Sequence, residues 1–352
     1  MKRRLLSPRG SSVAFFIFTV AAACSGYAAE TDQFLVWDVE LRDSAPALNS
    51  YLNEEASRFL SQENETHGSS RAPAQVTQDL YLYLFRSLLE SRLRHYLLTA
   101  SDIDRYPPST VSYPEHLEMS IYSAKSFPFI LPMARTIRIG DVYLGTDKLS
   151  HFFGFGRRYH KRYIRFREEG LSEESAMEKT VEWGMWCERY LVGNLTDGVY
   201  SYADLEANFQ GMMMARAFCE SPVPYLVVQG NRWLQARPID IVPFVTPAFD
   251  ESYNLSRYIG TRKHQVMRVL EAEVCPKTTL PVVKARFARY EQSEPSFSQR
   301  YIERCLLERG ESLNPRGDIA LWCASCREDG PTSRTAAGAS TQAAGAAALD
   351  AP

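Results

Sequence analysis

The sequence predicts a mainly α protein with a helical bundle-like core and irregular, proline-rich connections. Several stretches place apolar residues at helical spacing, and prolines interrupt the chain between them. Of the 352 residues, 45% are hydrophobic and 12% are aromatic, which is enough for a large core. The formal net charge is −2, so the composition is unlike that of a disordered chain and gives no overall basic field for nucleic acid. We therefore expect no nucleic-acid partner.

The N-terminal residues 1–29 predict a secretory signal peptide. A basic start (Met1, Lys2, Arg3, Arg4) precedes an apolar run over residues 13–23 and small residues around Cys24. Two processing routes stay open. Three alanines before Cys24 resemble a bacterial lipoprotein box, which would place a lipid on Cys24 as a membrane tether; ordinary cleavage nearby fits as well. Either route predicts an exported protein, periplasmic or anchored at the outer membrane as a lipoprotein.

The C-terminal residues 330–352 and the cysteines carry less information. The tail is mostly Ala, Gly, Ser and Thr, so we expect it to be disordered. Seven cysteines in an exported chain allow up to three disulfides once Cys24 is set aside. The pair Cys323-x-x-Cys326 suggests a redox pair or half of a zinc site, but no second such pair exists. A structural disulfide or unpaired thiols is the favoured interpretation.

Two flanking regions are expected to pack on a central core. Residues 30–140 form an N-terminal helical region with predicted helices over 47–60 and 74–99, and the second must end before Pro107 and Pro108. Residues 221–329 form a C-terminal helical and irregular region. It is predicted to contain extended pieces such as 225–228 and helices over 263–274 and 298–309.

The core, residues 141–220, contains three predicted helices. The first begins near residue 145 with Asp147 as N-cap, and His151 follows four residues later on the same face. Gly154 and Gly156 would allow another helix to approach closely. Later in this helix comes a run of basic residues, interpreted as a solvated face with contact to phosphate or anionic lipid as the alternative: Arg157, Arg158, Lys161, Arg162, Arg165 and Arg167.

The second and third helices add further polar candidates. The second helix starts at Ser172 and reaches about residue 192, with Glu188 on its apolar face and Glu182 on the opposite, solvated face. The third opens at Ser201 in a capping-box-like arrangement. Asp204 and Asn208 share one stripe of this helix, which is apolar on most sides and is therefore expected to be buried and central.

These helices predict a polar cluster in which His151, Glu188, Asp204 and Asn208 face one another. A histidine beside carboxylates can act as a general acid or base or hold a divalent cation. The favoured alternative is structural: Asp147 and Asp204 cap helices, and the other groups satisfy one another in a buried network. Zinc is disfavoured because one histidine and no thiolate match its usual ligand sets poorly. No cofactor or metal is identified from the sequence.

Three linked motifs in this region resemble a known family. They are Asp147-Lys148-x-x-His151, Gly184-x-x-x-Glu188 and Ser201-x-x-Asp204-x-x-x-Asn208-x-x-Gly211. The pattern resembles that of YfiM-like predicted periplasmic lipoproteins and, more distantly, of VanZ-like proteins, over residues 145–215. The resemblance implies a bacterial cell-envelope protein and adds Lys148 to the candidate residues. VanZ-like proteins cross the membrane several times, whereas no window after the signal suits a span, so their topology and drug resistance do not carry over.

Two functions therefore remain as hypotheses. The first is an exported cell-envelope protein without an assigned activity, whose buried cluster serves folding or binding of an envelope component. The alternative is a hydrolase or transferase acting on an envelope lipid or glycan. In that case His151 would be the acid or base, and Glu188 and Asp204 would orient it or hold a metal.

Overall fold

The computed structural model describes residues 29–87, 91–123, 133–191, 193, 198–311 and 323. As predicted, the fold is mainly α, and the strands form only small two-stranded sheets. The α-helices are α2 (Ala45–Thr66), α3 (Pro73–Leu84), α4 (Arg92–Thr99), α5 (Tyr113–Met119), α6 (Thr146–Ser150), α7 (Gly156–Glu168), α8 (Glu173–Tyr190), α10 (Tyr202–Cys219), α11 (Gly260–Val269), α12 (Pro281–Tyr290) and α13 (Phe297–Glu308). Short 3-10 and π segments are η1 (Gln33–Val36), η2 (His151–Phe155), η3 (Val242–Phe244), η4 (Pro247–Phe249), η5 (Leu270–Val274) and η6 (Cys275–Lys277).

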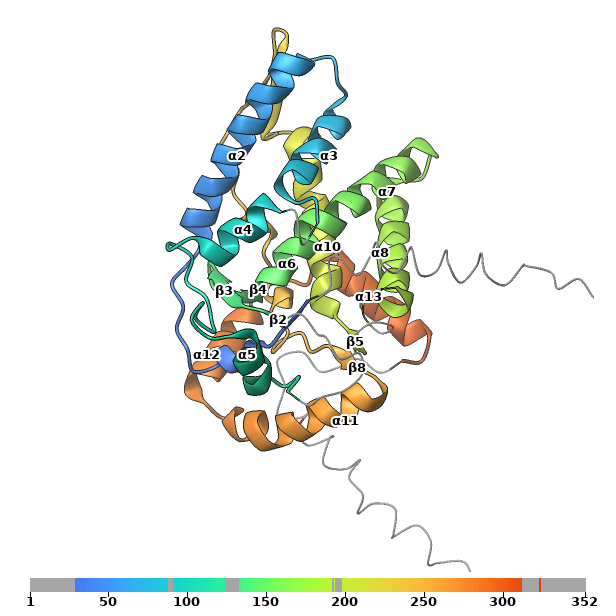
Figure 1. Ribbon diagram of the computed structural model, residues 1–352. Helices are drawn as coiled ribbons and strands as arrows, with labels where there is room; N and C mark the ends of the chain where they lie inside the picture. The colour runs from blue at the N-terminus through green and yellow to red at the C-terminus, as the bar shows by residue number, and fades with distance from the viewer. Residues whose placement is uncertain are drawn as a thin grey trace, which may run out of the picture.

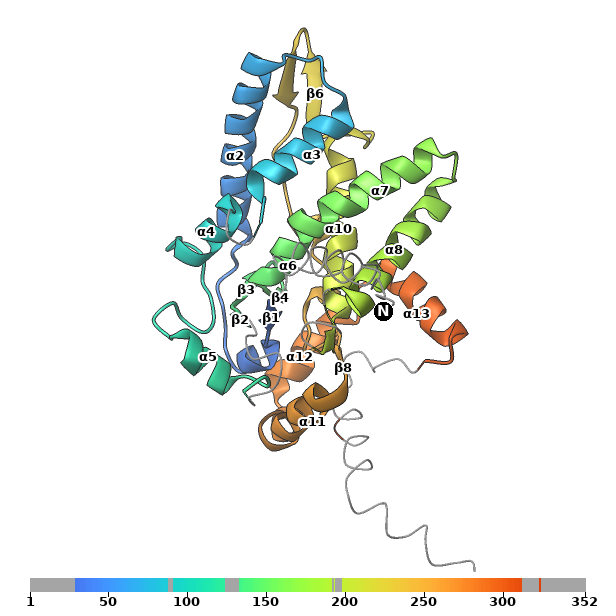
Figure 2. The same ribbon diagram turned by 45° about the vertical axis from the view of Figure 1, so that its right-hand side comes forward.

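Helix α10 lies at the centre of the molecule (Figures 1 and 2). Every residue from Ala203 to Met212 is buried, because other elements surround the helix on nearly all sides. Helices α7, α8 and α13 pack against it from one direction, and α3, η2 and η4 pack from others. A helix that is apolar nearly all round must be covered in this way. The prediction of a buried central helix is confirmed.

Of the four short strand pairs in the described chain, two connect distant segments and two are local hairpins. Parallel β1 (Glu30–Thr31) and β2 (Met133–Ala134) pair with Glu30 opposite Met133. The other pairs are antiparallel: β3 (Thr136–Ile139) with β4 (Val142–Gly145), β5 (Val199–Tyr200) with β8 (Arg257–Tyr258), and β6 (Leu226–Gln229) with β7 (Arg232–Gln235). Strand β4 leads directly into α6, and β1 lies next to both. This places the N-terminal end of the described chain beside the candidate site.

The first predicted core helix is continuous, but it changes from α-helix to π-helix and back. Helix α6 passes into η2, a π-helix, and then into α7. Gly156 lies directly against Gly211 of α10: a Cβ added at Gly156 would come 2.8 Å from the Gly211 Cα. Two glycines thus allow the two helices to cross at close range, as predicted for Gly156.

The predicted helix over residues 74–99 is wrong. The chain forms two shorter helices, α3 and α4, separated by residues 85–91. Phe85 is buried, and Ser91 starts α4 with its Oγ accepting a hydrogen bond from the Arg94 N–H at 3.0 Å. A straight helix of this length would extend about 39 Å, beyond the core it must cover. The break lets Leu93 and Leu97 of the second half become buried, so tertiary packing outweighs local propensity.

The C-terminal region follows the prediction in part. Strand β6 and helices α11 and α13 lie where extended or helical structure is predicted, but α11 ends at Val269 and the chain continues as the π-helix η5. Helix α12 is not predicted from the sequence. None of the helices within the described residues is long and apolar enough to span a membrane.

One disulfide joins Cys275 to Cys323. Cys323 is therefore bonded to a distant cysteine and does not form a redox pair with Cys326, which corrects that hypothesis; Cys326 itself lies outside the described residues. Among the described cysteines, Cys219 and Cys305 are free thiols. The predicted signal peptide, Cys24 and the tail at 330–352 also fall outside the described residues, apart from residue 29.

Candidate functional site

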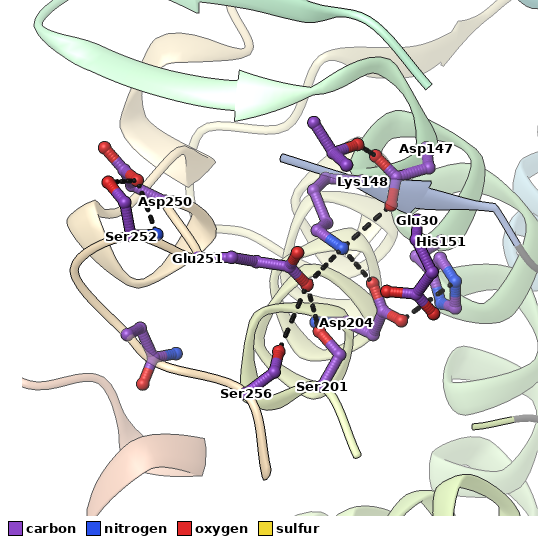
Figure 3. A network of polar contacts seen from close by, with 12 residues as sticks. Glu30, Asp147, Lys148, His151, Ser201, Asp204, Asp250, Glu251, Ser252 and Ser256 are labelled. Atoms are coloured by element: carbon purple, nitrogen blue, oxygen red, sulfur yellow. Dashed lines mark hydrogen bonds and ion pairs between the residues drawn. The ribbon is translucent and has the colours of Figure 1, made fainter. Parts of the chain in front are cut away.

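Lys148 lies at the centre of the candidate site and is fully buried. Its Nζ is 2.8 Å from Asp147 Oδ2, 2.6 Å from Asp204 Oδ1 and 2.8 Å from Glu251 Oε1 (Figure 3). An ammonium group has three protons, and here each proton has a carboxylate acceptor. A charge removed from water needs this degree of pairing, because its desolvation is otherwise very unfavourable.

We call Asp147, Lys148, His151, Asp204, Asn208 and Glu251 the polar cluster. Its members come from separate elements: α6 and the start of η2, the first two turns of α10, and the turn after η4. Hydroxyl groups hold the carboxylates in place. Thr31 Oγ1 donates to Asp147, and Ser201 Oγ donates to Glu251 Oε1 at 2.6 Å. The cluster therefore links β1, α6, α10 and the turn after η4.

The His151 imidazole has protein groups at both ring nitrogens. Its Nδ1 lies 3.2 Å from Asn208 Oδ1, and an amide oxygen only accepts, so Nδ1 carries a proton in this arrangement. Nε2 lies 3.4 Å from Asp204 Oδ2, a distance typical of an ion pair, although its direction is not that of a hydrogen bond.

The position of His151 in the backbone is also unusual. It is the first residue of the π-helix η2, and its ring stacks on Phe155 with centroids 5.4 Å apart. A π segment within an α-helix disrupts the regular hydrogen-bond ladder and is found frequently at functional sites. On the opposite side, α10 approaches so closely that a Cβ added at Gly211 would lie 1.9 Å from the Phe152 carbonyl oxygen. The imidazole is thereby fixed relative to Asn208 and Asp204.

Negative charge exceeds positive charge in this region. Burial raises the pKa of Glu251 to about 7, and Asp204 and Asp147 add to the rise while Lys148 opposes it. Among the described groups, Glu251 Oε2 has no hydrogen-bond partner. Glu30 of β1 is buried too, and its negative charge acts on Lys148. The cluster therefore holds a proton on Glu251 near neutral pH.

Lys148 remains charged under the same conditions. Burial alone would lower its pKa, but Asp147, Asp204 and Glu251 together raise that pKa well above the ordinary lysine value. An amine with so high a pKa is neither a base nor a nucleophile at neutral pH. Lys148 thus acts as a fixed positive charge.

Neither predicted aspartate cap is present. Gly145 is the N-cap of α6, and the Asp147 carboxylate instead contacts Lys148 and Thr31. For α10 the N-cap is Ser201, as predicted, and its Oγ accepts a hydrogen bond from the Asp204 N–H at 3.1 Å. The negative charge of each side chain is still favourable in the first turn of its helix. Contacts across the core, rather than capping, set the orientation of both carboxylates.

Glu188 is buried as predicted but lies apart from the imidazole. Its Oε1 accepts a hydrogen bond from the Ser201 backbone N–H at 3.1 Å, and Ser201 in turn contacts Glu251. The structure therefore brings together His151, Asp204 and Asn208 and connects Glu188 to Glu251 through Ser201. Glu182 is exposed and accepts a hydrogen bond from the Tyr301 hydroxyl at 2.6 Å.

Glu251 is the cluster member that sequence reasoning missed. It lies in a stretch with clustered acids over residues 247–254, where loop residues show no spacing that relates them to a helix face. Glu30 and Thr31 were missed for the same reason. The one available signal was the concentration of acids in a segment rich in Pro and aromatic residues.

The polar cluster does not have the geometry of a metal site. Within the described ranges, no group of three or more His, Cys, Asp or Glu side chains could hold a metal ion. The Lys148 ammonium occupies the place among the carboxylates that a cation would otherwise take.

Comparisons of the chain with protein-family models, with curated proteins and with solved structures gave no match.

Proposed function

We propose that the protein is an exported bacterial cell-envelope protein whose polar cluster fixes the packing of its helical core, and that this rigid core presents surfaces for binding an envelope component. One observation carries the proposal. Fully buried Lys148 directs its three protons to carboxylates from α6, from α10 and from the turn after η4. A charge in this position defines how three segments pack, because any other arrangement would leave it unpaired.

Export is supported by three features. The N-terminal sequence has the three parts of a secretory signal, and the motifs around Lys148 and Glu188 resemble those of YfiM-like periplasmic lipoproteins. The disulfide between Cys275 and Cys323 suits an oxidising compartment. A lipid on Cys24 would tether the protein to a membrane.

The geometry of His151 favours a structural role over catalysis. Its Nδ1 contacts Asn208, its Nε2 lies 3.4 Å from Asp204 without a hydrogen bond, and the residue is 2% exposed, so neither nitrogen is open to solvent. Lys148 likewise has every proton engaged. A general acid or base must reach the proton it transfers, and both groups here are closed off by protein atoms.

The test combines stability with function in cells. His151→Gln keeps a donor for Asn208 but removes acid-base chemistry, and His264→Gln is the matched control at an exposed position on α11. We expect His151→Gln to correct the envelope defect of a deletion strain whenever its unfolding free energy stays within about 1 kcal/mol of wild type. A stable His151→Gln protein that fails to correct the defect, while His264→Gln succeeds, would contradict the proposal.

A hydrolase or transferase acting on an envelope lipid or glycan is the second candidate function. The observation that favours it is the π-helix beginning at His151, since such segments are common at functional sites. Under this alternative, Glu188→Gln would also abolish function without loss of stability. Under the structural proposal, any loss of function in Glu188→Gln follows its loss of stability.

A further inference from the structure

We propose that the outward face of the α7–α8 pair binds the surface of an anionic phospholipid bilayer. This basic-aromatic face consists of Lys161, Arg162, Arg165, Lys179, Trp186 and Tyr190. The two helices lie side by side along one edge of the molecule, away from α2 and α12 (Figures 1 and 2). The inference is independent of the polar cluster and goes beyond the proposed function.

Two acids of α8 are engaged by α13. Glu178 bonds to Arg304 of α13, and Glu182 accepts a hydrogen bond from Tyr301 of the same helix. Glu182 precedes Trp186 by four residues, about 40° around α8, so it borders the face. Its contact with Tyr301 directs its carboxylate toward α13, and Lys179 and Tyr190 lie farther round the helix.

Three cations of the face, Lys161, Arg165 and Lys179, are exposed, and Arg162 is half-buried. Arg162 lies over the half-buried Trp183 ring at 4.0 Å from its centroid, and Lys179 lies 5.8 Å from the Phe166 centroid. Arg165 pairs with Glu169 at 2.8 Å, but both side chains are exposed to solvent. Exposed pairs of this kind contribute little, so Arg165 can exchange its partner for a phosphate at small cost.

Two large aromatic side chains continue the face along α8. Trp186 is 49% exposed and Tyr190 is 51% exposed, with their ring centroids 5.9 Å apart. A tryptophan beside a tyrosine combines apolar rings with polar tips, which suits the boundary between lipid headgroups and acyl chains. Neither ring contributes to the buried core.

Charge complementarity selects an anionic bilayer as the occupant. Helix α7 carries six Arg and Lys residues and one acid, Glu168, on a chain whose net charge is −2, so positive charge is concentrated on this helix. Nucleic acid needs a longer basic track. An acidic protein would use the cations but gains less from exposed aromatic rings with polar tips, whereas a bilayer interface uses both.

The experiment is sedimentation of the full chain with vesicles. All chains carry Cys24→Ser so that no lipid is attached, and all share the same N-terminal segment. The vesicles contain phosphatidylcholine alone or phosphatidylcholine with phosphatidylglycerol. The charge variant is Lys161→Gln, Arg165→Gln and Lys179→Gln; its matched control removes three exposed cations from α11 and α12, with Arg268→Gln, Lys284→Gln and Arg289→Gln. The aromatic variant is Trp186→Ser with Tyr190→Ser.

We expect binding to vesicles with phosphatidylglycerol that weakens about tenfold or more in the charge variant and is unchanged in the control. The aromatic variant should also bind more weakly. Two results would overturn the proposal: no charge-dependent binding by the parent chain, or an equal loss in the control triple variant. Full binding by the aromatic variant would overturn the part of the proposal that assigns Trp186 and Tyr190 to the bilayer interface.

Discussion

At the scale of single residues, the polar cluster is defined by its imbalance of charge. Lys148 is one cation facing Asp147, Asp204 and Glu251, and Glu30 adds a fourth buried carboxylate nearby. Burial raises the pKa of Glu251 to about 7, and its Oε2 has no hydrogen-bond partner among the described groups. Glu251 is therefore the group on which the cluster gains and loses a proton near neutral pH.

This assignment predicts the pH dependence of stability. The folded-state pKa of Glu251 is raised, so its contribution is fully present below its ordinary value of 4.5 and is lost as pH rises through about 7. The change amounts to roughly 3 kcal/mol. We expect Glu251→Gln to flatten the unfolding free energy between pH 4.5 and 8, as measured by urea denaturation at several pH values.

Asp32 provides the matched control for that measurement. Burial raises its pKa to about 6, and it accepts hydrogen bonds from the Ile121 and Phe34 N–H groups. Asp32→Asn should therefore reduce the pH dependence between about pH 4 and 6 and leave the dependence between about pH 6 and 7, which Glu251 sets, unchanged. A Glu251→Gln curve parallel to that of wild type would contradict the assignment.

Part of the cluster could be predicted from the sequence. His151, Asp204 and Asn208 lie on helices, where spacing relates residues to a face, and the structure brings them together. Lys148 is a candidate only through the motif shared with YfiM-like proteins, because a lysine is otherwise expected at the surface. Glu251 could not be predicted, since it lies in a turn about 100 residues beyond Lys148 and no periodicity connects the two.

At the scale of elements, the crossing of α10 with the segment η2–α7 sets the geometry of the site. Gly156 and Gly211 let the two backbones touch, and the π-helix holds His151 beside α10. The sequence showed the glycines and the helices. The π segment could not be predicted, because one additional residue in a turn hardly changes the spacing of apolar residues over so short a segment.

Gly211→Ala tests this crossing, because helix propensity and steric overlap change the free energy of unfolding in opposite directions. Helix propensity alone would make the alanine protein about 1 kcal/mol more stable. The added Cβ would lie 1.9 Å from the Phe152 carbonyl oxygen, so we expect instead a loss of about 1–3 kcal/mol or more. Chemical denaturation measures the change, and any gain in stability would contradict the close crossing.

Other element boundaries depended on contacts that the sequence does not reveal. The predicted helix over residues 74–99 contains neither Gly nor Pro, yet it divides at residues 85–91 because Leu93 and Leu97 must reach the core. Asp147 fits an N-cap by residue type, but Lys148 is a stronger partner for its charge than a backbone N–H would be. Long-range packing decided both positions.

At the scale of the whole molecule, the N-terminal and C-terminal regions both converge on α10. Strand β1 brings Thr31 to Asp147, and the turn after η4 brings Glu251 to Lys148. The disulfide between Cys275 and Cys323 then ties the far C-terminal part of the described chain to the end of η5. The mainly α class was predictable because helix signals are local, whereas this convergence depends on the tertiary fold.

We predict that the disulfide stabilises the whole molecule. It closes a loop with a sequence separation of 48, so Cys275→Ala with Cys323→Ala should lower the unfolding free energy by about 2–4 kcal/mol. Reductant should lower the melting temperature of wild type and leave that of the double variant unchanged. Cys219→Ala, at a free cysteine, serves as the control. A wild-type melting temperature insensitive to reductant would contradict the bond.

The most direct test of the central claim is the unfolding free energy of Lys148→Met, with Lys284→Met on the exposed face of α12 as control. Removing the buried ammonium leaves Asp147, Asp204 and Glu251 without their cation, so we predict a loss of about 3–5 kcal/mol at pH 8. The loss should shrink as pH falls and the carboxylates take up protons, while the control stays within about 0.5 kcal/mol of wild type at every pH. A Lys148→Met protein as stable as the control at pH 8 would contradict the account.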